Sequence, residues 1–407
     1  MDIGAPEAVA VSSARVTNGL RPGRRLARVS LWISSAVFVA AFLAVQAHAQ
    51  AAAVGQTRTP VPTPAPTQKA GKQMYDETCA ACHGVDGKGR DRPSVGFDYP
   101  LPDFTDCSYA SREQDQDWVG IAHVGGPLRA FTPIMPAFGD ALNDADLLRI
   151  IGHIRTFCTD PKWPRGELNL PRAFLTEKAY PEDEAVVTAG VTTNGSRTVD
   201  TAIIYEKRFG SLNQIELKLP IAAAKDASGA WSGGAGDIAA GFKRTLAHSL
   251  ERGSIIAASG EITFPTGDES AGLGTATPLF ETFVSFGQML PANAFVQGQA
   301  GIEMGFRPSR AEKESFWRVA LGQTLQQPMF GRTWTPILEI AATREIERGA
   351  PINWDVVPQV QVSLSRRQHV LMSVGLQMPL GPRNGRQTQF LIYFLWDWFD
   401  GGLFSGW

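Results

Sequence analysis

The stretch Cys79-Ala80-Ala81-Cys82-His83 sets the fold expected for the first part of this chain of 407 residues. A C-x-x-C-H run is the attachment site of a c-type haem. The two thiols add across the haem vinyl groups, and the adjoining histidine reaches the iron as proximal ligand. Two intervening residues place both sulfurs on one face of a short helix. We therefore predict one covalent haem c, held by Cys79, Cys82 and His83.

A zinc site, or a redox C-x-x-C with an incidental histidine, is the rival interpretation of this run. Zinc needs four ligands, and the sequence has no second paired set of Cys or His residues. A thioredoxin-type site requires a βαβ setting, which the flanking sequence does not offer. The motif therefore favours haem.

Charge and cysteine content narrow the classes of function. The formal net charge of −2 provides no basic surplus to neutralise phosphates, which argues against nucleic acid as a partner. Two of the four cysteines are assigned to haem, which leaves Cys107 and Cys158 as a candidate disulfide. Such a bond would close a loop of about fifty residues and add about 4 kcal/mol of stability; two buried free thiols are the alternative. This cysteine usage fits a compartment outside the cytoplasm.

The amino-terminal segment is typical of an export signal. Four arginines within residues 21–28 precede an apolar run over residues 29–45, and Ala47-His48-Ala49 follows as a cleavage site. A retained anchor helix is the alternative, but the run contains serines and is shorter than the span of about 20 residues that a membrane helix uses. We predict a signal peptide over residues 1–49. The Pro/Thr/Ala stretch of residues 50–68 cannot bury a core and is expected to be a tether.

Residues 69–160 show helical patterns around the haem motif. A first helix is expected over residues 71–78, a short one over residues 118–124, and a last one over residues 145–157, with Leu and Ile at helical spacing. The order of first helix, haem motif, loop and last helix resembles a class I cytochrome c, an all-α domain. That resemblance implies a methionine as sixth iron ligand, from the loop before the last helix.

Met135 stands at the place where the resemblance implies this ligand, and Pro136 would stiffen the loop that presents it. Met74 belongs to the first helix, on the proximal side. His123 is the competing candidate for the sixth position. A His/Met pair leaves no open position at the iron, so the domain is expected to carry electrons and not to bind a substrate there.

From residue 185 to residue 407 the apolar period changes to two. In residues 214–221, for example, aliphatic side chains alternate with Gln, Glu and Lys. About twelve such segments, most of about ten residues, follow with no helix between them. Ordinary strands average about 5–6 residues, whereas an outer-membrane strand needs about 9–11. Short turns alternate with longer links, which favours an antiparallel transmembrane β-barrel of about 12 strands over a soluble β-sandwich.

The cost of burying charge indicates which strand face meets lipid. Lys218 in the middle of the bilayer would cost about 2–4 kcal/mol, so we predict that the polar face lines the lumen. The aromatic last strand, residues 389–399, resembles the insertion signal of outer-membrane proteins. Residues 261–268, with Gly236-Asp237 upstream, resemble outer-membrane transporters linked to phenol meta-cleavage pathways. Residues 161–184 are expected to be a connector that packs on the haem domain or straps the two domains together.

These observations predict a multidomain chain, an all-α cytochrome c domain followed by the barrel, similar to the fused cytochrome–porins of iron oxidisers. The first hypothesis is an outer-membrane-anchored electron carrier with its haem domain in the periplasm. Its partners would be periplasmic redox proteins or small redox molecules, and outer-membrane lipid around the barrel. The alternative is a channel for small solutes, aromatic compounds among them, with the cytochrome as tethered partner or redox sensor. No nucleophile motif accompanies the isolated His248 and His369, so an enzyme is not predicted.

Overall fold

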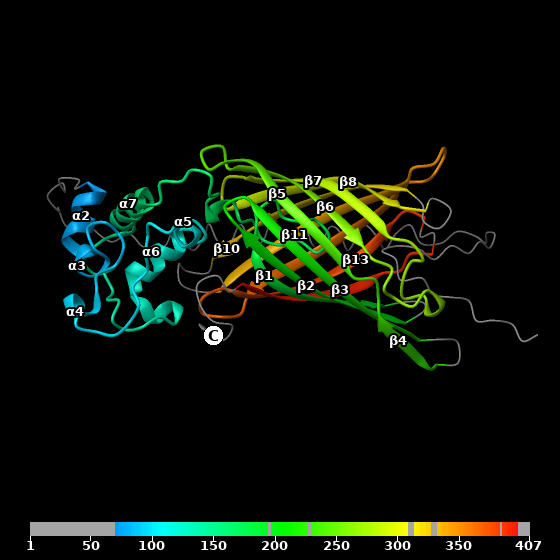
Figure 1. Cartoon of the computed structure of the whole chain (residues 1–407), viewed down its shortest axis with the longest axis horizontal. Helices are drawn as coiled ribbons and strands as arrows, with labels where there is room; N and C mark the ends of the chain where they lie inside the picture. Colours follow the sequence, from blue (N-terminus) through cyan, green and yellow to red (C-terminus); the bar gives the residue numbers. More distant parts are fainter. Residues whose placement is uncertain are drawn as a thin grey trace, which may run out of the picture. The chain divides into compact units, whose positions relative to one another are not determined.

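The computed structural model describes residues 70–193, 197–225, 229–307, 313–326, 332–382 and 385–397, which belong to one compact unit. The predicted signal peptide and tether, and the end of the predicted last strand with Trp407, lie outside these residues. Figure 1 shows a helical domain followed along the chain by a barrel of strands. Each helix in the described ranges is too short or too polar to cross a membrane.

Short helices form the domain around the C-x-x-C-H motif. They are α2 (Gly71–Thr78), α3 (Ala80–His83), α4 (Arg92–Val95), α5 (Cys107–Ala110), α6 (Asp115–Val124), η1 (Gly126–Arg129), α7 (Asp144–Ile154) and η2 (Arg155–Phe157). Helix α2 has the bounds that the sequence predicts. Asn143 caps α7, because its side chain accepts a hydrogen bond of 3.0 Å from the backbone N–H of Asp146. The predicted last helix changes to a 3-10 turn after Ile154.

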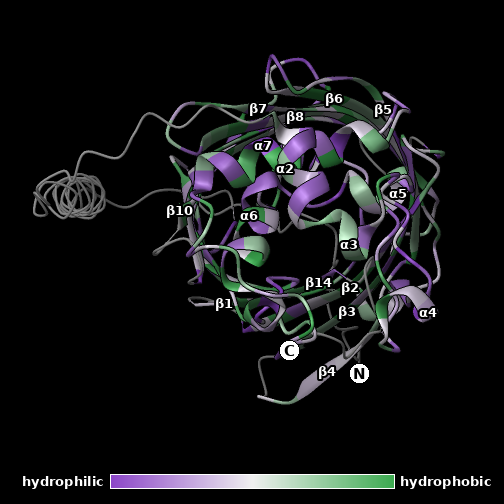
Figure 2. Cartoon of the chain, turned by 90° about the vertical axis from the view of Figure 1, so that its left-hand side faces the viewer, coloured by the Kyte–Doolittle hydropathy of each residue, from purple (hydrophilic) through white to green (hydrophobic). Residues whose placement is uncertain are grey.

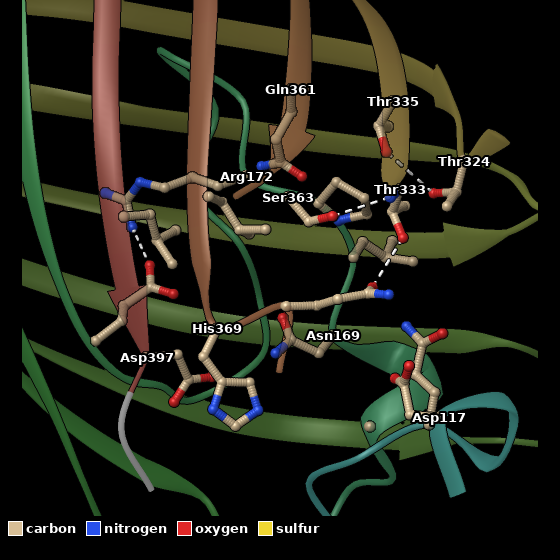
Figure 3. Close-up of a pocket in the computed structure, with 18 of the residues that line it drawn as sticks. Asp117, Asn169, Arg172, Thr324, Thr333, Thr335, Gln361, Ser363, His369 and Asp397 are labelled. Carbon is tan, nitrogen blue, oxygen red and sulfur yellow. Dashed lines mark hydrogen bonds and ion pairs between the residues drawn. The ribbon is translucent and has the colours of Figure 1, made fainter. Parts of the chain in front are cut away.

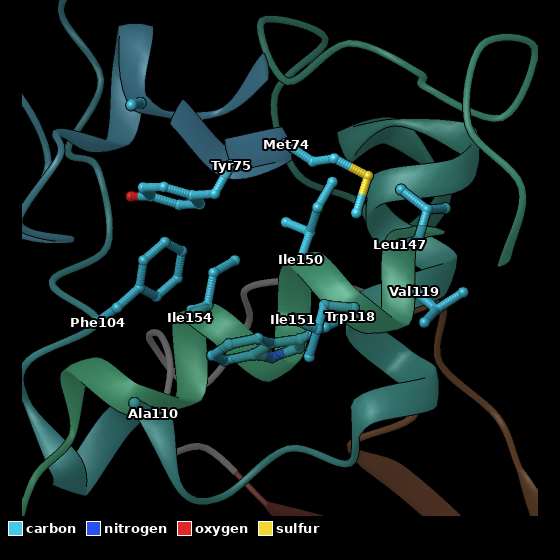
Figure 4. Close-up of a cluster of buried hydrophobic side chains, with 11 residues drawn as sticks. Met74, Tyr75, Phe104, Ala110, Trp118, Val119, Leu147, Ile150, Ile151 and Ile154 are labelled. Atoms are coloured by element: carbon cyan, nitrogen blue, oxygen red, sulfur yellow. The ribbon is translucent and has the colours of Figure 1, made fainter. Parts of the chain in front are cut away.

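Helices α2 and α7 pack against each other and enclose the apolar core of this domain (Figure 4). Met74 from α2 and Ile150 and Ile151 from α7 are at most 4% exposed. A Cβ atom at Gly71 would lie 2.1 Å from the carbonyl oxygen of Arg149, so the two helices can approach this closely only with glycine there. The helical pattern read from the sequence therefore produces a conventional apolar interior.

Twelve antiparallel strands in the described residues close into a barrel, which Figure 2 shows end-on. In ring order they are β1 (Asp183–Thr192), β2 (Thr198–Phe209), β3 (Asn213–Lys225), β5 (Ala239–Ser249), β6 (Ser254–Thr263), β7 (Leu279–Met289), β8 (Ala294–Gly305), β9 (Glu314–Gln323), β11 (Thr333–Glu345), β12 (Asn353–Ser363), β13 (Val370–Leu380) and β14 (Gln389–Asp397). The ring closes because β1 pairs with β14 and β9 pairs with β11. Two further strands, β4 (Trp231–Ala235) and β10 (Leu325–Gln326), extend hairpins beside it. The predicted barrel is confirmed, and the soluble sandwich is wrong.

The two faces of the strands have opposite character, as the sequence predicts. On β3, Ile215, Leu217 and Leu219 are 44%, 50% and 37% exposed, whereas Gln214 and Glu216 are 1% and 6% exposed. The same outward apolar pattern recurs around the ring. Its exposed members include Val187, Ile203, Phe242, Ile256, Val284, Phe286, Val319, Leu321, Leu338, Ile340, Phe390 and Phe394. The barrel is therefore apolar outside and polar inside.

The connector that follows the helical domain first packs on that domain, where the Gly166 N–H donates to the Ser111 carbonyl at 2.7 Å and Arg165 pairs with Asp115 at 2.7 Å. It then runs through the barrel interior, so it straps the two domains together, as the sequence predicts. The backbone N–H of Thr176 and its hydroxyl both donate to Glu339 of β11. On other sides of the ring, the Pro171 carbonyl accepts from Gln297 of β8 at 2.7 Å, and the Ala179 carbonyl accepts from Thr245 of β5 at 3.1 Å. Polar strand residues thus satisfy the backbone of a segment that has no secondary structure of its own beyond the turn η3 (Gly166–Leu168).

Charged side chains anchor the connector within the ring. Arg172 Nη1 lies 2.7 Å from a carboxylate oxygen of Glu184 on β1 and 2.7 Å from one of Glu206 on β2. Glu177 pairs with Lys218 of β3 at 3.2 Å. Lys218 therefore faces the lumen, as the cost argument predicts.

Candidate functional site

The C-x-x-C-H motif is fixed at the junction of two helices. Helix α2 ends at Thr78, and α3 carries Cys82 and His83. The hydroxyl of the buried Tyr75 donates a hydrogen bond of 2.6 Å to the carbonyl oxygen of Gly84, directly after the motif. Gly84 has φ +74°, a backbone conformation that glycine adopts without strain. The motif is therefore held from both ends by local structure.

A cavity of about 400 Å³ lies against the motif. The cavity is lined by the four residues that the sequence selects as haem attachment sites and iron ligands, namely Cys79, Cys82, His83 and Met135. Most of the remaining lining is aromatic or aliphatic. It includes Phe97, Tyr99, Phe104, Tyr109, Trp118, Ile121, Phe131, Ile134, Phe138, Leu142, Leu147, Ile150, Ile151 and Ile154. This is a concave apolar site with a few convergent ligating groups.

Hydrogen bonds tie the Met135 segment to the end of α6. The backbone N–H of Gly126 donates to the Met135 carbonyl at 3.1 Å, and the N–H of Phe138 donates to the Ala122 carbonyl at 2.9 Å. Gly125 has φ +92°, and a Cβ atom there would lie 3.0 Å from the Met135 carbonyl oxygen. The turn after α6 thus presents the methionine to the cavity.

His123, the competing candidate, does not line this cavity, and neither do Met74 and His153. His123 Nδ1 lies 3.0 Å from a carboxylate oxygen of Asp144, and its ring packs on Gly139. Met74 is 4% exposed in the core between α2 and α7. His153 packs edge-on against the rings of Tyr75 and Phe157. Geometry therefore favours Met135 as the sixth ligand.

Burial prepares His83 for iron. Desolvation lowers the pKa of His83 to about 4, so the imidazole is neutral at physiological pH, the form that binds a metal. Its ring stacks on Phe104 with centroids 5.1 Å apart. Cys79 and Cys82 are not joined in a disulfide. Two available thiols, a neutral histidine and a methionine around one apolar cavity fit haem c.

The remaining two cysteines, Cys107 and Cys158, are disulfide-bonded, with Cα atoms 5.0 Å apart. The bond joins α5 to the end of the helical domain. Arg155 reinforces the same region, since its guanidinium lies 3.8 Å from the centre of the Trp118 ring and 2.9 Å from Asp115.

Residues that sequence reasoning missed join the barrel to this domain. Arg366 and Arg367 of the β12–β13 turn, residues 364–369, contact Arg129 in the segment before Met135. His369 Nε2 lies 2.9 Å from a carboxylate oxygen of Glu113. Figure 3 shows His369 beside a polar cavity of about 160 Å³ that Asp117 and Arg172 also line. The contacting residues of the turn and of the helical domain are more than 200 positions apart in sequence, so no local sequence pattern could reveal these contacts.

Comparison with known families identifies residues 68–157 as a match to the cytochrome c family. The chain thus carries a cytochrome c domain followed by a closed barrel of twelve strands. Among solved structures, the chain is similar to an outer membrane channel from Pseudomonas putida F1, with 12% identity and a TM-score of 0.40 over 56% of this chain and 99% of that chain.

Two further structures give similar values. The NanC porin has 8% identity and a TM-score of 0.37, over 52% of this chain and 98% of the porin. The β domain of the Bordetella autotransporter BrkA has 11% identity and a TM-score of 0.35, over 53% of this chain and 98% of that chain. The comparison with curated proteins gives no match.

Proposed function

We propose that this protein is a mono-haem c-type cytochrome that is anchored in the outer membrane and carries electrons at the periplasmic mouth of its barrel. One observation carries the proposal: a single apolar cavity is lined by Cys79, Cys82, His83 and Met135. The cytochrome c match covers the same part of the chain.

Each residue has a distinct role. Cys79 and Cys82 would hold the haem through thioether bonds, and His83 and Met135 would be the ligands of its iron. When bound, the haem supplies a one-electron couple, whose potential a His/Met pair raises relative to a bis-His pair. The aromatic and aliphatic lining keeps water from the porphyrin. With His83 and Met135 both as iron ligands, the site would exchange electrons and would not bind a substrate at the iron.

The cavity reaches the protein surface where electrons could enter and leave. Tyr99 and Ile134 line it and are also 37% and 41% exposed. Periplasmic redox proteins or small redox molecules would approach the porphyrin edge at this opening.

The outer face of the barrel supports the membrane location. Its strands are 9 to 13 residues long, which matches the length that a tilted strand needs to cross a bilayer. Exposed aliphatic and aromatic side chains recur around the ring. Water-soluble monomers rarely expose large contiguous apolar patches, so this outer face supports a membrane location.

The lengths of the links support a periplasmic haem domain. The turns β2–β3, β5–β6 and β12–β13 have three, four and six residues, whereas the β6–β7 link at the other end has 15. Outer-membrane barrels have short periplasmic turns and longer outer loops. The β12–β13 turn contacts the helical domain through the Arg366 carbonyl, which accepts from Arg129.

The course of the connector favours the carrier over the channel. It bonds to β1, β3, β5, β8 and β11, on different sides of the ring, and so crosses the lumen. Large solutes would have to displace it. We therefore expect low single-channel conductance in a planar bilayer.

Haem staining of purified outer membranes, combined with heat-modifiable gel mobility, tests the proposal. The expected result is one haem-stained band whose mobility changes on boiling.

Met135→Ala should keep the covalent haem but abolish the methionine–iron charge-transfer band of the ferric form. The matched control Met74→Leu conserves volume in the core and should keep that band. A haem stain in the soluble fraction, or an unchanged band in Met135→Ala, would contradict the proposal.

A further inference from the structure

The β12–β13 turn of the barrel touches a wall of the haem cavity. The guanidinium carbon of Arg367 lies 4.2 Å from the centre of the Phe131 ring, within cation–π range. Its Nε donates a hydrogen bond of 3.3 Å to the carbonyl oxygen of Arg129. Phe131 and Met135 line the same cavity.

The contact is reciprocal. Arg129, whose side chain is 6% exposed, donates through Nη1 to the carbonyl oxygen of Arg366 at 3.2 Å and pairs through Nη2 with Asp117 at 2.8 Å. Ala130 lies between the two contacting residues and has φ +56°, a left-handed conformation that residues with a Cβ rarely adopt. Contacts on both sides of Ala130 hold the chain in this unfavourable conformation.

Backbone hydrogen bonds extend the contact to Met135. The N–H of Phe131 donates to the Gly126 carbonyl at 3.0 Å, and the N–H of Gly126 donates to the Met135 carbonyl at 3.1 Å. A Cβ atom at Gly126 would lie 2.3 Å from the carbonyl oxygen of Thr132, so the loop is closely packed. Arg367, Phe131, Gly126 and Met135 thus form one continuous series of contacts.

We propose that Arg367 is a positioning residue for the sixth haem ligand, through which the folded barrel holds the Met135 segment over the cavity. This inference rests on the proposed function, since it assumes that Met135 binds iron. A thioether is a neutral, weakly basic ligand, so the fraction of protein with methionine bound depends on how firmly the loop presents it. The barrel turn would therefore affect both axial ligation and reduction potential.

The test compares two arginines of the same turn in the full-length holoprotein. Arg367→Ala removes the ring contact and the hydrogen bond. Arg366→Ala is the matched control, because that side chain is exposed and the backbone carbonyl that contacts Arg129 remains. Three quantities are measured: the methionine–iron charge-transfer band, the reduction potential, and amide hydrogen exchange over residues 126–138.

In Arg367→Ala we expect about fivefold faster exchange in this segment, the factor that a cation–π contact of ordinary strength provides. The charge-transfer band should weaken and the potential should fall, while Arg366→Ala matches the wild type. Arg367→Lys should lie between, because an ammonium keeps the charge but not the planar stacking. Phe131→Leu, which keeps the cavity apolar but removes the ring, should reproduce the change and serves if Arg367→Ala does not fold.

Equal exchange and equal bands in Arg367→Ala, Phe131→Leu and Arg366→Ala would overturn the positioning role and leave the proposed function intact. A wild-type protein without the methionine–iron band would overturn the assignment of Met135 and this inference with it. Heat-modifiable mobility of each variant verifies that the barrel is folded.

Discussion

The interiors of the two regions have opposite chemistry. In the helical domain, Met74, Val119 and Leu147 are at most 4% exposed and belong to an apolar core. In the barrel, Gln297 and Glu339 are just as buried, at 1% and 0%. The two regions differ in whether the apolar or the polar face of each helix or strand points to the interior.

This difference shows what the surroundings of each region must be. A water-soluble domain gains stability by moving apolar surface away from water. The barrel instead exposes aliphatic side chains and buries polar ones, which is the pattern expected of a barrel surrounded by lipid, as in the proposed function. Its interior is held by hydrogen bonds and ion pairs to the connector, where the helical domain uses close apolar packing.

The largest effect on stability is expected when the ion pairs inside the barrel are broken. Arg172→Ala removes the cation between Glu184 and Glu206, whose side chains are each 2% exposed. Glu184 keeps Lys178 at 3.2 Å, but the loss of a buried cation that two carboxylates share should lower the free energy of unfolding by about 3–5 kcal/mol. Urea unfolding in lipid vesicles, followed by tryptophan fluorescence, measures the loss.

A triple variant separates charge from packing. Arg172→Met combined with Glu184→Gln and Glu206→Gln removes all three charges while keeping similar volumes, and should recover most of the stability. If Arg172→Ala were as stable as the wild type, the barrel interior would not depend on these ion pairs, and the contrast with the apolar core would fail.

Sequence alone could predict the parts of the fold that have a local pattern. The bounds of α2 and the outward apolar face of the strands follow from apolar spacings of three to four residues and of two residues, respectively. Met135 followed from its place before the last helix in the cytochrome resemblance, and the structure puts it in the same cavity as His83.

The path of the connector could not be predicted in this way. Its residues have no period, and its position depends on partners that are distant in sequence. Thr176 bonds to Glu339, 163 positions away, and Arg172 pairs with Glu206, 34 positions away. The contact of Arg367 with Phe131 has the same origin. Such contacts join residues that come together only in the closed barrel, so no local pattern in the sequence predicts them.

An intermediate effect is expected at the outer face of the barrel. Leu219, in the middle of β3, is 37% exposed, whereas the adjacent Lys218 faces the lumen 2.8 Å from both Glu216 and Glu261. Leu219→Lys would place an unpaired charge in the lipid, at a cost of about 2–4 kcal/mol. The same vesicle assay measures it, with Leu219→Phe as the apolar control. If Leu219→Lys left the stability unchanged, this face of the strand would be in contact with water. The contrast between the surroundings of the barrel and those of the helical domain would then lose its basis.

The smallest expected effect lies in the helical domain, where stability depends on local backbone satisfaction. The first N–H groups of a helix have no partner within the helix, and at α7 the Asn143 side chain accepts from one of them. Asn143→Ala should lower the free energy of unfolding by about 1 kcal/mol, whereas Asn143→Asp keeps an acceptor and should be close to neutral. Thermal unfolding of the full chain, followed at the haem absorbance, should show the lower midpoint in the alanine variant alone.

The barrel transition should not move, because strands satisfy their backbone groups by pairing with one another and need no caps. Equal shifts in both transitions would mean that the two regions unfold as one unit, which would place the contacts between the barrel turn and the haem domain above the local ones in importance.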